Sequence, residues 1–194
     1  MIARTHDLAA ITGLLVVAIV LYPLPQMSLA TIIAAVIANQ FGGIAPDIDQ
    51  PTAPLWRNIS IGKLFGRVFG RMLGGHRFLT HSIVGVLLLG WLFHLLLLFI
   101  QPIFPKVDIE IVWWAFIIGM LSHLVMDSFT KEGVPWLLPI PIKFGFPPVK
   151  RLRITTGKRI EKFVVFPVLV IIVVVLCSSY YAEFIDLFEN RIVS

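Results

Sequence analysis

The chain has 194 residues, of which 58% are hydrophobic and only 14% are charged, and its net charge is +5. So few charged side chains cannot cover the surface of a water-soluble globule of this length. The composition excludes a soluble protein and predicts one integral membrane domain over residues 1–194. The single cysteine, Cys177, excludes an intrachain disulfide.

Five apolar stretches approach the roughly 20 residues that a membrane-spanning helix needs. They are Leu8 to Leu24, Ser28 to Ala45, Phe78 to Ile100, Ile109 to Met126 and Phe163 to Phe184. The first is expected to be a retained helix, because no small-residue cleavage site of a signal peptide follows it. The second is the weakest, because polar residues and glycines interrupt its end, and it is expected to tilt or break unless it lines a cavity. The predicted fold class is all-α, a polytopic membrane protein with about five transmembrane helices.

Basic residues predict the orientation of these helices. Of the 16 Lys and Arg residues, 14 lie in three segments: the N-terminus, the connection from the second to the third helix, and the connection from the fourth to the fifth. The positive-inside rule places these segments, and the N-terminus with them, in the cytoplasm. The basic loops are therefore expected to contact anionic membrane lipids, and nucleic acid is not the expected partner. Residues 59–73 are predicted to form a helix that lies in the membrane interface.

Histidines and aspartates gather at the predicted cytoplasmic ends of the helices. They are His6 in the first helix, Asp47 and Asp49 after the second, His76 and His81 at the start of the third, and His123 and Asp127 at the end of the fourth. Ionisable groups persist beside hydrocarbon when they are paired, bind a metal or face a cavity. The remaining histidine, His94, lies deep in the third helix without an acidic neighbour, and is interpreted as a packed polar residue.

The spacing of these residues fits metal ligands. His123 and Asp127 are four residues apart and share one helix face, so they can bind one metal ion or two adjacent ions. Asp47 and Asp49 lie in a turn between prolines and can bind separate ions or bridge a pair. Mixed imidazole and carboxylate ligands suit zinc, and also manganese or iron. The number of candidate ligands favours two ions over one.

Each motif alone has a simpler explanation. An isolated Asp-x-Asp is typical of a solvated turn, and the His123–Asp127 pair is equally compatible with a structural hydrogen bond. The shared location of all the motifs at one membrane face is what indicates a metal site. The predicted metal ligands are His6, Asp47, Asp49, His76, His81, His123 and Asp127.

The motifs, in order, also match a known family. They are His6, Pro46-Asp47-Ile48-Asp49, Gly75-His76-Arg77, Thr80-His81-Ser82, Gly119-Met120-Leu121-Ser122-His123 with Asp127 and Thr130, Gly133-Val134-Pro135, and Gly157 with Glu161. Over nearly its whole length the chain resembles the YdjM-like bacterial inner-membrane proteins, which are classed as predicted metal-dependent hydrolases. It also looks distantly similar to zinc-dependent phospholipase C and P1-type nucleases. The chain departs from the family at Gln50, where a histidine is common, and at Phe78, where a glycine is common.

The resemblance implies a bacterial inner-membrane hydrolase with one or two divalent metal ions, most simply zinc. The distant likeness suggests cleavage of a phosphoester in a lipid or lipid-linked, phosphate-bearing substrate at the inner leaflet. A bound metal would acidify water, Asp49 or Glu161 would act as general base, and Arg77 would bind a phosphate oxygen.

Two other classes of protein stay open at this point. One is a transporter or metal-binding permease, although such sites usually lie near the bilayer midplane. The other is a non-catalytic membrane scaffold. The sequence carries no indication of the oligomeric state.

Overall fold

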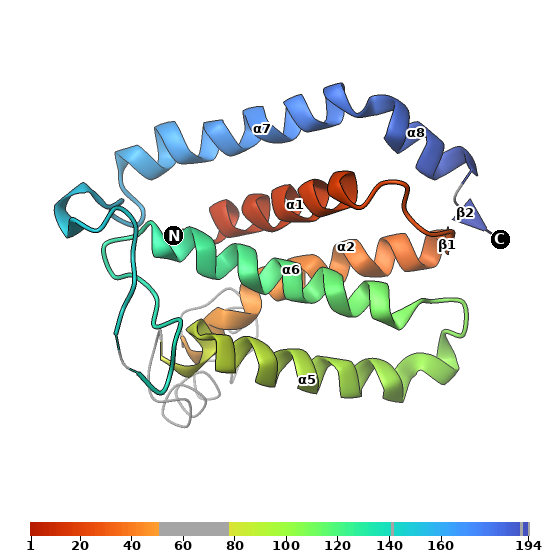
Figure 1. The fold of residues 1–194 in the computed structure, drawn as a ribbon, viewed down its shortest axis with the longest axis horizontal. Coiled ribbons are helices and arrows are strands. Elements are labelled where there is room, and N and C mark those ends of the chain that lie inside the picture. Colours follow the sequence, from red (N-terminus) through yellow and green to blue (C-terminus); the bar gives the residue numbers. More distant parts are fainter. Residues whose placement is uncertain (51–77, 141, 191, 194) are drawn as a thin grey trace, which may run out of the picture.

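The computed structural model describes residues 1–50, 78–140, 142–190 and 192–193. The main helices lie lengthwise beside one another (Figure 1); they are α1 (Ala3–Val20), α2 (Leu29–Ile44), α5 (Ile83–Ile100), α6 (Ile109–Ser128) and α7 (Phe166–Ser179). Five segments of the described chain are long and apolar enough to cross a membrane. The predicted all-α fold with five spanning helices is confirmed.

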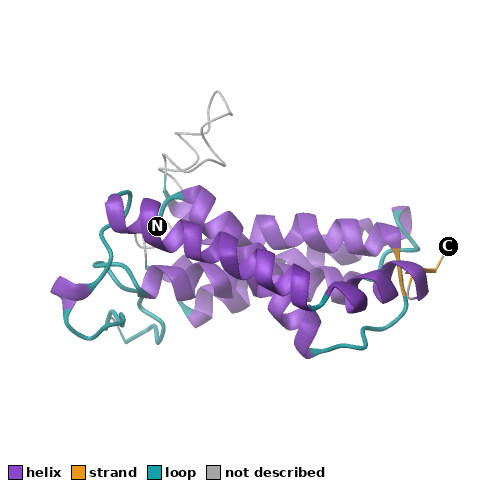
Figure 2. Cartoon of the chain, turned by 90° about the horizontal axis from the view of Figure 1, so that it is seen from above, coloured by secondary structure: helices purple, strands orange, loops and turns teal. Residues whose placement is uncertain are grey.

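Shorter elements continue or connect these helices. They are β1 (Met27–Ser28), η1 (Ala45–Asp49), η2 (Leu79–His81), η3 (Gln101–Ile103), η4 (Lys150–Leu152), the π-helix η5 (Glu161–Val165), α8 (Tyr181–Asn190) and β2 (Ile192–Val193). Strands β1 and β2 pair in parallel at the end of the bundle opposite the N-terminus (Figure 1). Seen from above, the helices form one elongated bundle with loops at both ends (Figure 2).

Helix α6 lies at the centre of the bundle and packs against α1, α2 and α5. Its side chains Phe116 and Met120 belong to the buried apolar core. The closest packing is with α2, where two glycines let the backbones touch. A Cβ at Gly119 would lie 2.1 Å from the carbonyl oxygen of Asn39, and one at Gly42 would lie 2.0 Å from that of Phe116. Small residues permit such close approach between membrane helices, and here they fix the end of α2 beside the end of α6.

The second predicted helix does reach a membrane-spanning length, because η1 continues α2 to give the segment Leu29–Asp49. The polar side chains that weaken its sequence pattern bond to other helices. Asn39 donates to the carbonyl of Ala115 at 3.1 Å, and Gln40 donates to the carbonyl of Asp7 at 3.3 Å. Their polar groups are therefore satisfied inside the bundle, where lipid offers no partner.

The fifth helix ends earlier than the sequence pattern predicts. Helix α7 stops at Ser179, and a separate helix, α8, begins at Tyr181. Helix α8 carries acidic residues, and Tyr22 donates a hydrogen bond to the carboxylate of Asp186 at 2.9 Å. Charged residues and tyrosines favour the interface over the hydrocarbon, so the chain turns there.

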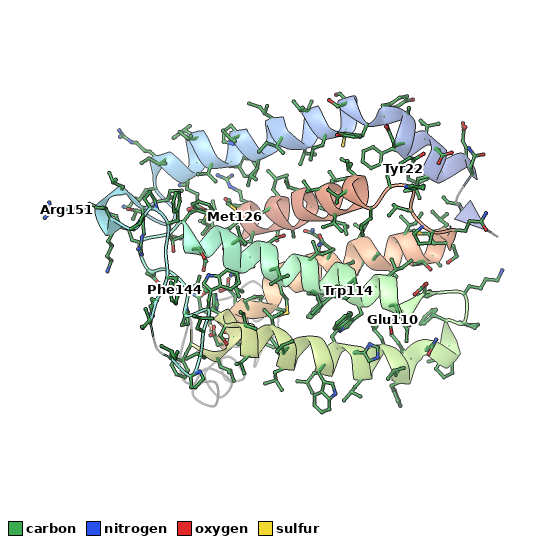
Figure 3. All side chains as sticks on the ribbon, in the orientation of Figure 1. Tyr22, Glu110, Trp114, Met126, Phe144 and Arg151 are labelled. Atoms are coloured by element: carbon green, nitrogen blue, oxygen red, sulfur yellow. The ribbon has the colours of Figure 1, made fainter. Side chains whose placement is uncertain are left out.

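Charge distinguishes the two ends of the bundle. Figure 3 places Met126 and Arg151 toward the end where the N-terminus lies, with Glu110 and Tyr22 toward the other. We call the first the basic end; it includes the N-terminus, η1, η2, the connection 129–160 and the start of η5. Its described cations are Arg4, Lys131, Lys143, Lys150, Arg151, Arg153, Lys158, Arg159 and Lys162.

Three sequence predictions lie outside the described residues. They are the interfacial helix at 59–73, the metal ligand His76 and the phosphate-binding residue Arg77.

Candidate metal centre

A cluster of buried imidazoles and carboxylates lies at the basic end. It contains two groups of possible metal ligands, His6, His123 and Asp127, and Asp47, His81 and His123, with the donor atoms of each group within 4.8 Å of one another. Asp47 is 20% exposed, and the other four side chains are at most 2% exposed. Burying ionisable groups is costly unless they are paired or bind a cation. The cluster is therefore the candidate functional site.

Two carboxylate oxygens lie near the same two imidazole nitrogens. Asp47 Oδ1 lies 3.6 Å from His81 Nε2 and 3.8 Å from His123 Nε2. Asp127 Oδ2 lies at the same two distances, 3.6 Å and 3.8 Å, from these nitrogens. Tetrahedral zinc, with bonds of about 2.0 Å, separates its ligand atoms by about 3.3 Å. The four oxygen–nitrogen distances exceed this spacing by about 0.3–0.5 Å, so each carboxylate lies close enough to share a cation with both imidazoles.

The second oxygen of Asp127 has a different environment. His6 Nε2 lies 3.4 Å from Asp127 Oδ1, and the N-terminal ammonium of Met1 contacts the same oxygen. The His6 ring stacks on that of His123, with 3.7 Å between the centroids. Asp127 therefore connects His81 and His123, through Oδ2, to His6 and the Met1 ammonium, through Oδ1.

Hydrogen bonding prepares His123 to bind a metal. Its Nδ1 lies 2.7 Å from the carbonyl oxygen of Gly43, which can only accept, so Nδ1 carries the proton. Its Nε2 is buried and has no hydrogen-bond partner among the described residues. Buried polar atoms nearly always have a partner, and metal-binding histidines commonly donate their other nitrogen to a carbonyl. The unpaired Nε2 therefore fits a metal ligand.

Asp49 lies next to this cluster but in neither donor group of the described residues. It is 2% exposed, and its Oδ2 accepts a hydrogen bond from Thr80 Oγ1 at 2.7 Å. The same Thr80 oxygen lies 3.0 Å from His81 Nδ1. In the sequence, Thr80 was noted only as part of a family motif and was given no role, although its position beside His81 was the available signal. The contact between His123 and the backbone carbonyl of Gly43 was not predicted either. Every residue has a backbone carbonyl, so the sequence carries no signal for this contact.

Glu161 ties two backbone segments together beside the site. Its side chain is fully buried, and its two oxygens accept hydrogen bonds from the backbone N–H groups of Ile2 at 2.7 Å and Gly157 at 2.6 Å. It belongs to neither donor group found among the described residues. These contacts hold the start of α1, which carries His6, against the turn that precedes η5.

Replacing Glu161 with glutamine is expected to destabilise this tether. The amide nitrogen cannot accept a hydrogen bond, so one backbone N–H loses its charged partner, at a cost of about 1.5–3 kcal/mol. The measurement is thermal unfolding in detergent, with Glu189→Gln, at an exposed position of α8, as the control. An equal melting temperature for both variants would contradict the tethering role.

His94 does not belong to the cluster of described residues. His94 lies on α5 and packs edge-on against Trp113, with 5.9 Å between the ring centroids. The candidate centre therefore contains histidines from α1, η2 and α6, and His94 belongs to neither donor group of the described residues.

Five membrane-length helices with a buried His/Asp cluster at one end define a multi-pass membrane protein with a candidate metal centre. Residues 1–185 match the family model described as YdjM inner membrane protein. The chain belongs to this family and is a multi-pass inner membrane protein. The predicted family is thus confirmed.

Individual relatives agree with this assignment. The Bacillus subtilis (strain 168) protein YvsG, described as uncharacterized, is 32% identical over 152 residues, which cover 77% of this chain and 78% of YvsG. The inner membrane protein YdjM of Escherichia coli (strain K12) and that of Shigella flexneri are each 31% identical over 122 residues, or 62% of this chain and 56% of each relative. No solved structure matches the chain.

Proposed function

We propose that this protein is a membrane-bound metal-dependent hydrolase that cleaves a phosphoester of a lipid or lipid-linked substrate at the inner leaflet. The observation that carries the proposal is the convergence of His6, Asp47, His81, His123 and Asp127 from four separate elements. Zinc is the proposed metal, because mixed imidazole and carboxylate donors suit it; manganese and iron accept the same donor types.

The two donor groups, which share His123, support one or two ions. Asp47, His81, His123 and Asp127 would hold the first ion, and His6 with Asp127 would contribute to a second ion that takes the place of the Met1 ammonium. A bound divalent cation supplies Lewis acidity and lowers the pKa of water. In the proposed reaction the water oxygen bonds to phosphorus, the ester P–O bond breaks, and the departing oxygen takes up a proton. The substrate would approach from Asp47, the partly exposed member of the donor set.

The surroundings of the centre support a membrane substrate that carries a phosphate. The positive-inside rule would place the basic end in the cytoplasm, where it would attract anionic headgroups. The connection 129–160 exposes Phe146 and Leu152 near Lys143 and Arg151. Such mixtures of apolar and cationic side chains are typical of segments at headgroup depth.

Three finer assignments stay predictions. They are the general-base roles of Asp49 and Glu161, the phosphate-binding role of Arg77, and the distant similarity to phospholipase C and P1 nuclease. The proposed reaction type depends on the similarity to phospholipase C and P1 nuclease. The proposed metal centre does not depend on that similarity.

The proposal is tested by loading the purified protein in lipid nanodiscs with zinc. Phosphatidic acid, phosphatidylglycerol and bis(p-nitrophenyl) phosphate are then assayed for hydrolysis. We expect zinc-dependent cleavage that is lost on chelation and restored by zinc. Absence of cleavage of every phosphoester by fully loaded protein would contradict the proposal, and metal uptake into sealed vesicles without cleavage would favour the permease.

Replacing Asp127 with asparagine is expected to lower zinc affinity about 100-fold or more and to abolish hydrolysis, because both carboxylate oxygens contact candidate ligands. The matched control is Asp108→Asn at the other end of α6. Asp108 caps that helix by accepting from the N–H groups of Glu110 and Ile111, and asparagine caps equally well. Equal zinc affinities for the two variants would contradict the assignment of Asp127.

A further inference from the structure

Hydrogen bonds connect Asp49 to His81 through the hydroxyl group of Thr80. Thr80 Oγ1 lies 2.7 Å from Asp49 Oδ2 and 3.0 Å from His81 Nδ1. The three residues are 1%, 2% and 0% exposed, in the order Thr80, Asp49 and His81. Water therefore does not compete for these contacts, and their geometry determines which nitrogen of the His81 imidazole carries the proton.

The direction of each hydrogen bond follows from the chemistry of the groups. An ionised carboxylate can only accept, so the Thr80 hydroxyl proton is donated to Asp49. The Thr80 oxygen then accepts the proton of His81 Nδ1. With that proton on Nδ1, the lone pair of His81 is on Nε2, the nitrogen that lies 3.6 Å from both Asp47 Oδ1 and Asp127 Oδ2.

We infer that Asp49 and Thr80 are positioning residues that set the tautomer and ring orientation of the metal ligand His81. Metal-binding histidines usually donate their second nitrogen to a carboxylate or carbonyl, which fixes the ring and raises its basicity. Here a hydroxyl stands between the imidazole and the carboxylate. The inference rests on the metal centre of the proposed function, and it holds whatever reaction that centre performs.

The backbone that carries Thr80 and His81 is held independently of the His81–Thr80–Asp49 hydrogen bonds. Ser82 is the N-cap of α5: its hydroxyl oxygen accepts from the N–H of Gly85 at 3.1 Å and donates to the carbonyl of Leu79 at 2.6 Å. Removing the Thr80 hydroxyl should therefore leave η2 in place. The other ligand, His123, depends on a backbone carbonyl that no substitution removes, so Thr80 is the point where ligand orientation can be tested.

The test compares Thr80→Val, which keeps the shape but removes the hydroxyl, with Thr80→Ser, which keeps the hydroxyl. Zinc affinity is measured by competition with a chromophoric chelator, and geometry by the visible spectrum of the Co²⁺-loaded protein. We expect Thr80→Val to lower zinc affinity about 10–100-fold and to change the Co²⁺ bands. Thr80→Ser should restore both, because it rebuilds the donor and the acceptor.

Asp49→Asn provides a second, independent variant. Its amide oxygen still accepts from Thr80, so a positioning role predicts a loss of zinc affinity below about 10-fold, whereas a ligand role predicts the loss expected for Asp127→Asn. If Thr80→Val binds zinc like the wild type while His123→Ala does not, the positioning role of Thr80 and Asp49 is wrong, but the metal centre is supported. If His123→Ala also retains zinc, the metal centre itself is wrong.

Discussion

Replacing His123 with alanine is expected to abolish metal binding, with zinc affinity lowered by more than about 100-fold. His123 is the ligand common to both donor groups. Its Nε2 faces Asp47 and Asp127, and its ring stacks on His6. Its removal therefore takes one donor from both groups and also removes the ring that packs on His6, another candidate ligand.

The measurement is the zinc content of purified protein after equilibrium dialysis, by elemental analysis. The matched control is His94→Ala, the same substitution in another membrane helix, where the imidazole contacts Trp113 and no carboxylate of the cluster. The control should keep its zinc. Full zinc content in His123→Ala would show that the cluster is not the binding site.

Replacing Gly119 with alanine is expected to destabilise the whole bundle by about 3 kcal/mol or more. The new methyl carbon would lie 2.1 Å from the carbonyl oxygen of Asn39 and 2.8 Å from the backbone nitrogen of Gly43. Neither atom can move without shifting α2 away from α6. Because α2 leads into Asp47 and α6 carries His123, the same shift should also weaken zinc binding.

The control for this prediction is Gly90→Ala on α5, where the added carbon would meet the end of a flexible side chain, Ile117 Cδ1, at 2.6 Å. Thermal unfolding in detergent compares the two variants. We expect the apparent melting temperature of Gly119→Ala to be lower by roughly 6–12 °C and that of Gly90→Ala to change little. A smaller decrease for Gly119→Ala than for Gly90→Ala would contradict the close packing of α2 on α6.

Sequence alone predicts much of this architecture because the membrane imposes strong constraints. A bilayer requires long apolar helices, so five such segments are visible without any structure. Alternating passes return the end of α2, the start of α5 and the end of α6 to one face. For this reason Asp47, His81 and His123 were expected to share that face before their distances were known.

The remaining features depend on contacts that leave little trace in the sequence. The end of α7 is an exception: Tyr180, Tyr181 and Glu183 are visible in the sequence, but the predicted helix continued past them to Phe184. Asp49 and Asp47 look equivalent as an Asp-x-Asp pair, yet η1 directs Asp47 toward the imidazoles and Asp49 toward Thr80. Glu161 likewise appears as a lone acid, and its tether to Ile2 joins residues 159 positions apart.

X-ray absorption at the zinc edge of the loaded protein tests the central claim most directly. A centre built from Asp47, His81, His123 and Asp127 predicts nitrogen and oxygen neighbours at about 2.0–2.1 Å, the scattering pattern of two imidazole rings, and no sulfur. Stoichiometric zinc with a sulfur neighbour at about 2.3 Å, or without imidazole scattering, would contradict it.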